Sequence, residues 1–368
     1  MSSRLRADAQ SRRLAAVRAV GRRRSRRPVV SRRAAVSVDL AAELARNLYG
    51  VDGQVHRLTA EKDANFRVTM GSGEQALLKI TNAAEDRAVT DMQTAALMHI
   101  AAVDPSLPVP QVRWSLNGEA SELVSLPAGQ THVVRLLSYL DGTVLSAATG
   151  GGALHREIGT LLGRLALALR GFSHPAAGHV LQWDIQQAHR LRPMLEAVAD
   201  PGLRARLTAL IDLFEADIQP RLTSLRAQVG HNDFNPHNLL VDSAEATRLT
   251  GIIDFGDMVL TPVVCDLAVA CSYQIADTDR PLDDVARLIA GFTEVLPLED
   301  EEFALLPDLI RLRHATSLTI GAWRARRYPD NAAYILRNTA VSLRGLNALD
   351  RIGTEGALAA LSRKENMR

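Results

Sequence analysis

The sequence predicts an α+β fold with two lobes, in which a small antiparallel sheet with one helix precedes a mainly helical part. Segments with the period-two pattern of strands dominate residues 37–140, whereas long segments with helical spacing dominate residues 141–368. The two parts meet near Tyr139–Gly142, where an apolar strand ends in a glycine turn. With 368 residues and 47% hydrophobic content, the chain is long enough to form two lobes with a substantial core.

In the first lobe, local patterning justifies each element in turn. Apolar residues at helical spacing run from Val38 and stop at Gly50, which predicts a short opening helix. The segments NFRVTM and QALLKI flank Gly71–Gly73 and predict a β-hairpin. The helical segment EDRAVTDMQTAALMHIAAV comes next, followed by two strand-like segments, LPVPQV and HVVRLLSYLDG. Up to Leu140 the predicted order is strand, strand, strand, helix, strand, strand, and NFRVTM and QALLKI are two of the first three strands.

The second lobe is predicted to be helical at about 153–172, 183–198, 202–222, 281–294 and 300–327, with a last helix near 330–350. Two strand-like exceptions, NLLV and LTGIIDF, predict a small hairpin with polar residues at its tip. The two cysteines lie in the apolar segment VVCDLAVACSY, where we interpret them as small buried hydrophobic residues.

Charge is distributed unevenly along the chain. Residues 1–35 contain twelve arginines and one acid, so the remaining residues carry 31 basic and 40 acidic side chains, a net charge of −9. We interpret residues 1–36 as a disordered Arg-rich extension, although their composition also resembles that of a transit peptide or a nucleic-acid-binding arm. No apolar segment reaches the about 18 residues that a membrane span requires. A cytoplasmic location is expected, with nucleic-acid binding confined to the extension if it occurs.

The segments HNDFNPHNLLV and TGIIDFGDMV contain a group of polar residues at informative spacing. His231, Asp233 and Asn238 form the pattern H-x-D-x-x-x-x-N, and Asp254 follows Asn238 by sixteen residues across the predicted hairpin. Phosphoryl transfer uses a carboxylate near the acceptor hydroxyl and oxygen ligands that hold Mg²⁺ on the nucleotide phosphates. We therefore predict that Asp233 is the catalytic carboxylate and that Asn238 and Asp254 are the metal ligands.

For three other residues of the first segment, two roles are considered. His231 is placed among the catalytic residues together with Asp233. A role in stabilising the loop by a hydrogen bond is favoured for it over a role as general base. Asn235 and His237 either contact the substrate or satisfy the backbone groups of the loop.

A cation for the nucleotide phosphates is expected in the first lobe. Lys79 is the only lysine inside an apolar strand pattern, and the chain has only two other lysines, Lys62 and Lys364. We predict that Lys79 binds phosphate and that its partner lies on the next helix, where Gln93 occupies the most plausible position.

These segments, in this order, resemble the aminoglycoside phosphotransferase and choline kinase superfamily, which has a protein-kinase-like fold. The segments DANFRV, LLKI, DMQTAAL, FNPHNLLV and GIIDFGDM are most similar to the hydroxylysine kinase and homoserine kinase-like branch. The resemblance spans about 40–350. It implies ATP or GTP with Mg²⁺ as the phosphoryl donor and a small hydroxylated amine or amino acid as the acceptor, with 5-hydroxylysine favoured.

The resemblance also extends to the nucleotide site, where the chain departs from the family pattern. The segment TAEKDANF, which should cover the nucleotide, lacks glycines, so Asn65 is expected to help bind it. Ser138 and Leu140 are expected to contact the nucleotide at the hinge. Asn232 stands where family members often have glycine, and Gln93 replaces the glutamate that usually pairs with the lysine.

Acceptor specificity is expected to come from the second lobe. The candidates are Asp257 and the segment GAWRARRYPDN, in which Trp323 could pack against an aliphatic chain and Arg324 or Arg327 could bind a carboxylate. An equally plausible interpretation of this segment is a helix end with solvated arginines and a core tryptophan. An arginine-bearing pocket would favour an amino acid, whereas a polycationic aminoglycoside would require an acidic pocket.

Two alternatives belong to other functional classes. A metal-dependent hydrolase could use His231, Asp233, His237 and Asp254 as ligands of a transition metal, but Lys79 would then have no role. A catalytically silent, nucleotide-binding pseudokinase is the second alternative, and the presence of all three predicted catalytic and metal-binding residues argues against it. Among kinase acceptors, homoserine and aminoglycosides remain alternatives to 5-hydroxylysine.

Overall fold

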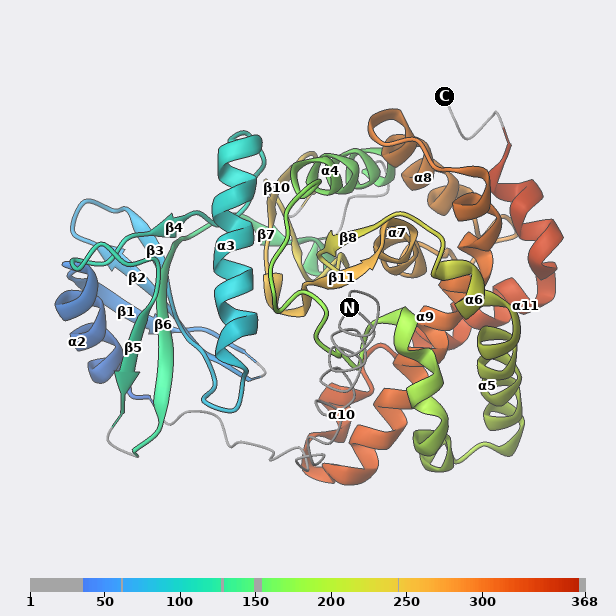
Figure 1. The fold of residues 1–368 in the computed structure, drawn as a ribbon, viewed down its shortest axis with the longest axis horizontal. Helices are drawn as coiled ribbons and strands as arrows, with labels where there is room; N and C mark the ends of the chain where they lie inside the picture. The colour runs from blue at the N-terminus through green and yellow to red at the C-terminus, as the bar shows by residue number, and fades with distance from the viewer. Residues whose placement is uncertain (1–35, 61, 127–128, 149–153, 244, 364–368) are drawn as a thin grey trace, which may run out of the picture.

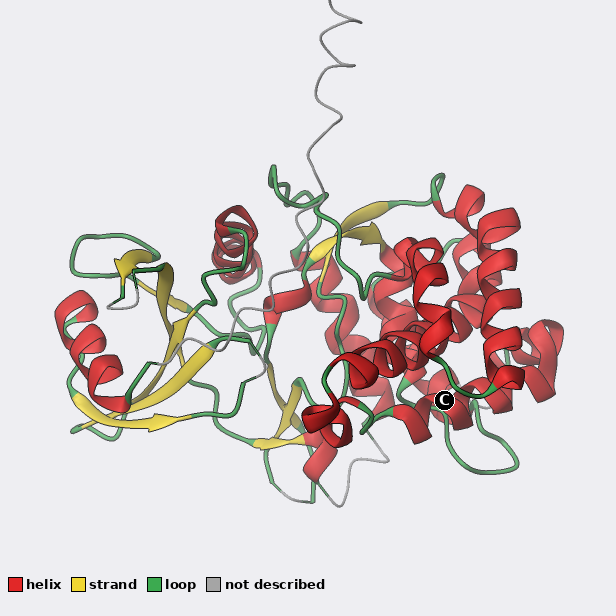
Figure 2. Cartoon of the chain, turned by 90° about the horizontal axis from the view of Figure 1, so that it is seen from below, coloured by secondary structure: helices red, strands yellow, loops and turns green. Residues whose placement is uncertain are grey.

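The computed structural model describes residues 36–60, 62–126, 129–148, 154–243 and 245–363. Strands dominate one end of the molecule and helices the other (Figures 1 and 2). The predicted α+β organisation is confirmed, while the extension predicted for residues 1–36 lies almost entirely outside the described residues. No helix in the described ranges is both long enough and apolar enough to cross a membrane.

The first lobe is an antiparallel sheet with a helix on each face. Its strands follow the order β1-β2-β3-β6-β4, and β5 also pairs with β6. Helix α2 packs on the outer face, and helix α3 lies on the face toward the second lobe (Figure 1). The elements are α2 Val38–Tyr49, β1 Gly53–Arg57, β2 Ala64–Met70, β3 Gln75–Ile80, α3 Arg87–Val103, β4 Val112–Arg113, β5 Glu122–Ser125 and β6 Thr131–Ser138.

Burial explains why the sheet has two different faces. Alternate residues of β2, including Phe66 and Val68, are fully buried in a core shared with α2. The buried residues of α3, among them Met92 and Ile100, belong instead to the core of the second lobe. Helix α3 therefore belongs to the first lobe in the chain but packs into the core of the second lobe, and so it joins the two lobes.

The second lobe contains two small sheets, β10-β9-β7 and β11-β8, surrounded by helices. Its strands are β7 Thr143–Val144, β8 Ala227–Gly230, β9 Leu239–Val241, β10 Leu249–Ile252 and β11 Val259–Pro262. Its α-helices are α4 His155–Ala168, α5 Pro201–Leu213, α6 Gln219–Leu222, α7 Val263–Ser272, α8 Asp283–Val295, α9 Asp300–Arg327, α10 Ala332–Ile335 and α11 Thr339–Leu361.

Two predictions about this lobe need correction, and one is confirmed. The segment Ile185–Ala197 is a 3₁₀ helix containing Pro193 rather than an α-helix, because proline removes a backbone donor. Cys265 and Cys271 are buried, as predicted, and their segment forms helix α7. No element was predicted there, because all ten residues of α7 are buried and the helix shows no amphipathic pattern. The last helix is α11, which lies later in the chain than predicted.

Two glycines allow helices α4 and α8 to cross closely. A Cβ atom at Gly291 would lie 1.9 Å from the Arg156 carbonyl oxygen, and one at Gly159 would lie 1.9 Å from the Leu288 carbonyl oxygen. No side chain fits at either position without a backbone shift.

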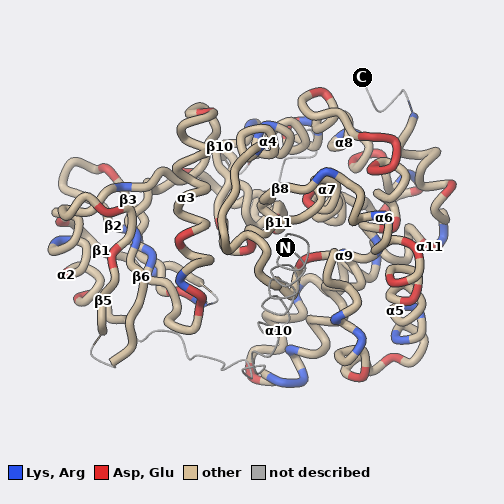
Figure 3. Tube along the Cα trace, viewed as in Figure 1, with Lys and Arg blue, Asp and Glu red and all other residues tan. Residues whose placement is uncertain are grey.

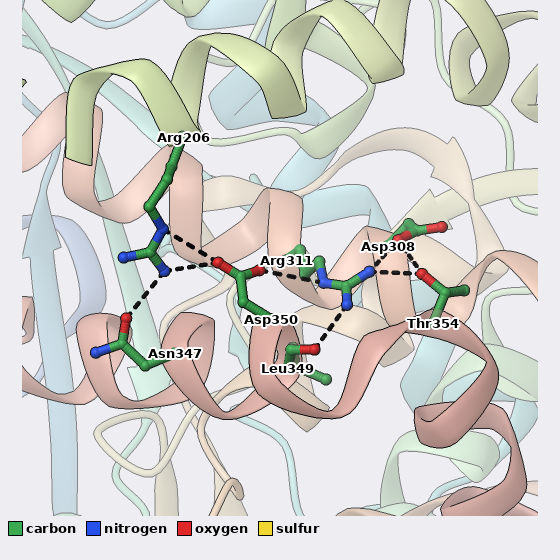
Figure 4. Close-up of polar contacts among 7 residues, drawn as sticks. All are labelled: Arg206, Asp308, Arg311, Asn347, Leu349, Asp350 and Thr354. Carbon is green, nitrogen blue, oxygen red and sulfur yellow. Dashed lines mark hydrogen bonds and ion pairs between the residues drawn. The ribbon is translucent and has the colours of Figure 1, made fainter. Parts of the chain in front are cut away.

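A polar network around the buried Arg311 links helix α9 to α11, and α11 to α5 (Figure 4). Arg311 of α9 donates to Asp308 at 2.7 Å and to the Leu349 carbonyl oxygen of α11 at 2.7 Å. Asp350 of α11 accepts from Arg206 of α5 at 2.7 Å and lies 3.6 Å from the Arg311 guanidinium. The network lies two residues before Arg313, a side chain of the site described next.

Candidate active site

A cavity of about 720 Å³ lies between the two lobes. Its walls combine the sheet face that carries Lys79 with the polar loops at the open end of the β9–β10 hairpin. The prediction that the polar site residues lie at the tip of this hairpin is wrong, because the loops precede β9 and follow β10 while the tip is residues 242–248. Most of the side chains predicted to form the site line this one cavity; they are Asn65, Lys79, Gln93, Ser138, Leu140, Asp233, Asn235, His237, Asn238, Asp254, Asp257 and Arg324.

The loop that carries Asp233 is held by hydrogen bonds at its start. The backbone N–H groups of His231 and Asn232 each donate to the Asp266 carboxylate at 2.8 Å. Asn232 adopts a left-handed conformation with φ of 59°, which asparagine tolerates better than most residues. This explains how the chain turns here with asparagine where glycine would be the usual choice.

Within the loop, two asparagines fix the position of Asp233. Asn238 Nδ2 donates to the Asp233 carboxylate at 2.8 Å and to its backbone oxygen at 2.9 Å. Asn235 donates to the same backbone oxygen at 3.1 Å and accepts from the His237 backbone N–H at 2.8 Å. The side chain of Asn235 thus satisfies loop backbone groups, the second of the two roles considered for it.

His231 lies behind the loop rather than in the cavity. Its side chain is fully buried, and Nε2 lies 3.1 Å from the carbonyl oxygen of Ile253, the residue before Asp254. Its ring also packs edge-on against Phe255 at 4.9 Å. This position fits a residue that joins the Asp233 loop to the Asp254 segment, and it offers no path for His231 to act as a base.

Asp254 is placed in the cavity by an unusual backbone conformation. Its φ is 60°, and its carboxylate accepts from the Gly256 backbone N–H at 3.3 Å while remaining exposed. Asn238 uses its amide nitrogen on Asp233, so its amide oxygen is the atom that remains for a cation. Carboxylate and amide oxygens from neighbouring strand ends suit a hard divalent cation.

Arg313 of α9 is a site residue that the sequence reasoning missed. Its Nη2 donates to the Asp233 carboxylate at 3.1 Å, its Nη1 donates to the Trp183 backbone oxygen at 2.9 Å, and only 2% of the residue is exposed. Burial raises the pKa of Asp233 to about 6, and the Arg313 charge opposes that rise. Arg313 therefore favours the ionised form of Asp233, the form that can accept a proton.

Asp257 is a second carboxyl group with a raised pKa in the cavity. Burial first, and then the charge of Asp233, raise the pKa of Asp257 to about 7. Two carboxyl groups with raised pKa values side by side are typical of a functional site.

The predicted partner of Lys79 is wrong. Lys79 Nζ lies 3.2 Å from the carboxylate of Asp63, in the loop before β2. Gln93 instead donates to the Gly256 carbonyl oxygen at 3.1 Å and accepts from Arg135 at 3.3 Å. Gln93 thus links the sheet to the segment that carries Asp254, a contact between residues 163 positions apart that no local pattern could indicate.

The remaining predicted nucleotide-site residues lie around Lys79 and the hinge. Asn65 lies opposite Lys79 in the β2–β3 register, and its Oδ1 is buried without a hydrogen-bond partner. At the hinge, Ser138 Oγ accepts from the Gln111 backbone N–H at 2.9 Å, next to Leu140 in the cavity wall. The unpartnered Oδ1 of Asn65 and the backbone groups of the hinge could form hydrogen bonds with a bound nucleotide.

The predicted acceptor-site residues divide into two groups. His237, Asp257 and Arg324 line the cavity, whereas the cavity wall does not include Trp323 or Arg327. The guanidinium of Arg327 packs over the Trp323 ring at 5.5 Å on the basic end of α9 (Figure 3). This fits the helix-end interpretation, except that Trp323 is only half-buried and does not belong to the core.

Further cavity residues come from segments in which the sequence showed no motif. They are Trp183, Tyr273 and Arg313 near Asp233, and Tyr334, Arg337 and Asn338 beside His237. Burial and the Arg337 charge lower the pKa of His237, whose Nδ1 lies 2.9 Å from Ser146 Oγ. A charged residue in the apolar segment LIRLRHA was the one available signal for Arg313.

The geometry argues against a transition-metal hydrolase. In the described ranges, no three His, Cys, Asp or Glu side chains are grouped so that they could hold a metal ion. His231, a proposed ligand in that alternative, is turned away from the cavity. The cavity has Lys79 and Arg135 on the sheet side and the carboxylates of Asp233 and Asp254 on the side of the second lobe.

Comparison with known proteins also favours a phosphotransferase over a hydrolase. The sequence profile of the phosphotransferase enzyme family matches residues 23–300. Hydroxylysine kinase of Danio rerio is 28% identical over 326 residues, which cover 85% of this chain and 91% of the relative. Homoserine kinase of Methylobacterium radiotolerans is 32% identical over 219 residues, or 58% of this chain and 62% of the relative.

Solved structures show the same fold at low sequence identity. A microcompartment-associated aminopropanol kinase superposes with a TM-score of 0.67 at 18% identity, covering 88% of this chain and 100% of that structure. An amicoumacin kinase in complex with AMP-PNP, Ca²⁺ and its substrate superposes with a TM-score of 0.62 at 16% identity, covering 84% and 93%. Because the family profile matches about three quarters of the sequence, the chain belongs to the phosphotransferase enzyme family, as a kinase of small-molecule hydroxyl groups.

Proposed function

We propose that the chain transfers the γ-phosphoryl group of Mg²⁺-bound ATP or GTP to the side-chain hydroxyl of a hydroxylated amino acid, with 5-hydroxylysine favoured. In this proposal Asp233 accepts the hydroxyl proton, Asn238 and Asp254 hold the metal ion, and Lys79 binds phosphate. The bound metal ion would neutralise charge on the transferred phosphoryl group. Arg313 keeps Asp233 ionised and fixes its orientation.

The observation that carries the choice of acceptor is the distribution of charge around Asp233. The charge of Asp233 raises the pKa of Asp257, which shows that the two carboxyl groups interact. Arg313 balances one of these two charges, so the reacting end of the acceptor site still has room for an ammonium group. In 5-hydroxylysine an ammonium group stands on the carbon next to the hydroxyl-bearing carbon. A hydroxyl at Asp233 would therefore bring that ammonium group toward Asp257, where it would be paired.

Positive charge also lines the cavity. Arg324 at the end of α9 and Arg337 before α11 belong to its wall, and arginine is well suited to bind a carboxylate. An acceptor that carries both an amino alcohol and an α-carboxylate could pair with charges of both signs in this cavity. Homoserine has a carboxylate but no amine beside its hydroxyl, and an aminoglycoside would meet these arginines with like charge.

The names of the relatives support the same proposal, since they include hydroxylysine kinases and homoserine kinases. The chain covers 91% of the length of the first of these relatives. A cytoplasmic location, expected from the sequence, stays a prediction.

A direct test measures nucleotide consumption with ATP and with GTP against 5-hydroxylysine, homoserine, ethanolamine and kanamycin, and identifies each phosphorylated product by mass spectrometry. The highest kcat/KM is expected for 5-hydroxylysine. Asp257→Asn should reduce kcat/KM for 5-hydroxylysine and ethanolamine much more than for homoserine. Phosphorylation of kanamycin alone, or equal effects of Asp257→Asn on all acceptors, would overturn the proposed acceptor.

A further inference from the structure

Arg135 is a buried cation in the cavity wall that the predicted machinery does not use. It lies on β6 directly opposite Lys79 of β3 in the antiparallel register, so the two side chains share one face of the sheet. Both residues line the cavity, and only 2% of Arg135 is exposed. Two positive charges thus stand next to each other at the end of the cavity that Lys79 marks.

The two cations differ in how their charges are balanced. Lys79 has the Asp63 carboxylate at 3.2 Å. The hydrogen-bond partners of Arg135 are both neutral, since Nη1 donates to Thr94 Oγ1 at 3.2 Å and Nη2 donates to Gln93 Oε1 at 3.3 Å. Its Nε is buried with no hydrogen-bond partner, and among the described residues no carboxylate lies within ion-pair distance of its guanidinium.

This arrangement is unfavourable for the protein without a ligand. A buried charge is tolerated in a protein when an opposite charge or full hydrogen bonding compensates it. Burial lowers the pKa of Arg135, but an arginine stays protonated at any physiological pH. The carboxylates of Asp63, Asp91 and Asp254 oppose this effect only from beyond ion-pair distance. Arg135 therefore lacks an anion in direct contact, and the donor Nε is the atom left to meet one.

We propose that Arg135 is a second phosphate-binding residue, which together with Lys79 binds the polyphosphate of the nucleotide. This inference rests on the proposed function, because it takes the cavity to be the nucleotide site. Arginine can present two parallel donors to phosphate oxygens, which lysine cannot. The pair would discriminate nucleoside triphosphates and diphosphates from the bare nucleoside.

The test compares the binding of Mg²⁺·ATP and of adenosine to the full-length wild type and to Arg135→Met by titration calorimetry. Loss of a charge-assisted contact should weaken ATP binding by about 10- to 100-fold. Adenosine has no phosphate, so its affinity should change by less than about twofold. Arg113→Met is a matched control, because it removes a cation from β4 on the other side of β6, outside the cavity, and should leave both affinities unchanged.

Thermal unfolding of the ligand-free protein distinguishes this proposal from a purely structural role. If Arg135 binds phosphate, Arg135→Met removes a buried charge that has no ion-pair partner and should leave the melting temperature unchanged or higher. If Arg135 only anchors α3 through Gln93 and Thr94, the melting temperature should fall and both ligands should lose affinity by the same factor, which would overturn the proposal. A wild type that binds neither ligand would refute the nucleotide site itself, whereas equal ATP binding by wild type and Arg135→Met would refute the second phosphate-binding residue alone.

Discussion

Replacing Arg313 with methionine should shift the pH dependence of catalysis. Arg313 Nη2 lies 3.1 Å from the Asp233 carboxylate, and Arg313 is the main group that opposes the effect of burial on that carboxyl. A neighbouring arginine lowers the pKa of an aspartate by about 1–3 units, so its loss should raise the Asp233 pKa from about 6 to about 8. Activity requires the ionised form, so the acidic limb of the pH profile should move upward with the pKa.

The size of the effect at neutral pH follows from the ionised fraction. At pH 7 that fraction should fall from about nine tenths in the wild type to about one tenth in Arg313→Met, a loss of about tenfold in kcat/KM. Activity should recover at about pH 9, since the carboxylate ionises there in both proteins. The assay is kcat/KM for the acceptor measured at intervals from pH 5.5 to 9.5.

Arg311→Met provides the control for this experiment. Arg311 lies two residues earlier in α9, in the network of Figure 4, and it does not line the cavity. Its replacement should lower stability without moving the acidic limb. If Arg313→Met reduced kcat/KM by the same factor at every pH, Arg313 would have no electrostatic effect on Asp233 and the reasoning would be refuted.

Three further predictions concern the metal ion, the packing of the helices and a buried histidine. Asp254→Ala should abolish the Mg²⁺ dependence of nucleotide binding measured by calorimetry, and an unchanged dependence would remove Asp254 from the metal site. Gly291→Ala should lower the free energy of unfolding in urea by about 1–3 kcal/mol, because a Cβ atom would meet the Arg156 carbonyl oxygen; an unchanged midpoint would contradict the close crossing. Burial, and then the Arg313 charge, lower the pKa of His314 to about 3. Below pH 6.5 the unfolded chain therefore binds a proton that the folded protein excludes, and the free energy of unfolding decreases as the pH is lowered. Between pH 7 and pH 5 the free energy of unfolding of the wild type should decrease by about 2 kcal/mol more than that of His314→Met. An equal decrease in both proteins would refute the lowered pKa of His314.

The parts of the fold that the sequence predicted are those with local signals. The hairpin around Gly71–Gly73 is marked by alternation and turn residues, and it forms as expected. The segments with Asp233 and Asp254 are each short and polar, and they flank a hairpin that brings them together. Local patterning fails for α7, because a helix buried on all sides has no polar face to reveal its period.

The missing parts of the site depend on contacts between distant segments. Arg313 meets Asp233 across 80 residues, and Lys79 pairs with Asp63 in a loop instead of with the helix that follows it. Gln93 was correctly placed in the cavity wall but assigned the wrong partner, because its contacts depend on how α3 sits between β6 and Gly256. Such pairings are set by tertiary packing and leave no spacing rule in the sequence.

The most direct test of the account is the rate of phosphoryl transfer to 5-hydroxylysine by Asp233→Asn, measured in a single turnover together with the affinity for Mg²⁺·ATP. Asparagine preserves the size of the side chain but cannot accept the hydroxyl proton. The account predicts a rate reduced by about 100-fold or more, with nucleotide affinity within about twofold of the wild type. Transfer at the wild-type rate would contradict the central claim that Asp233 is the base of a hydroxyl kinase.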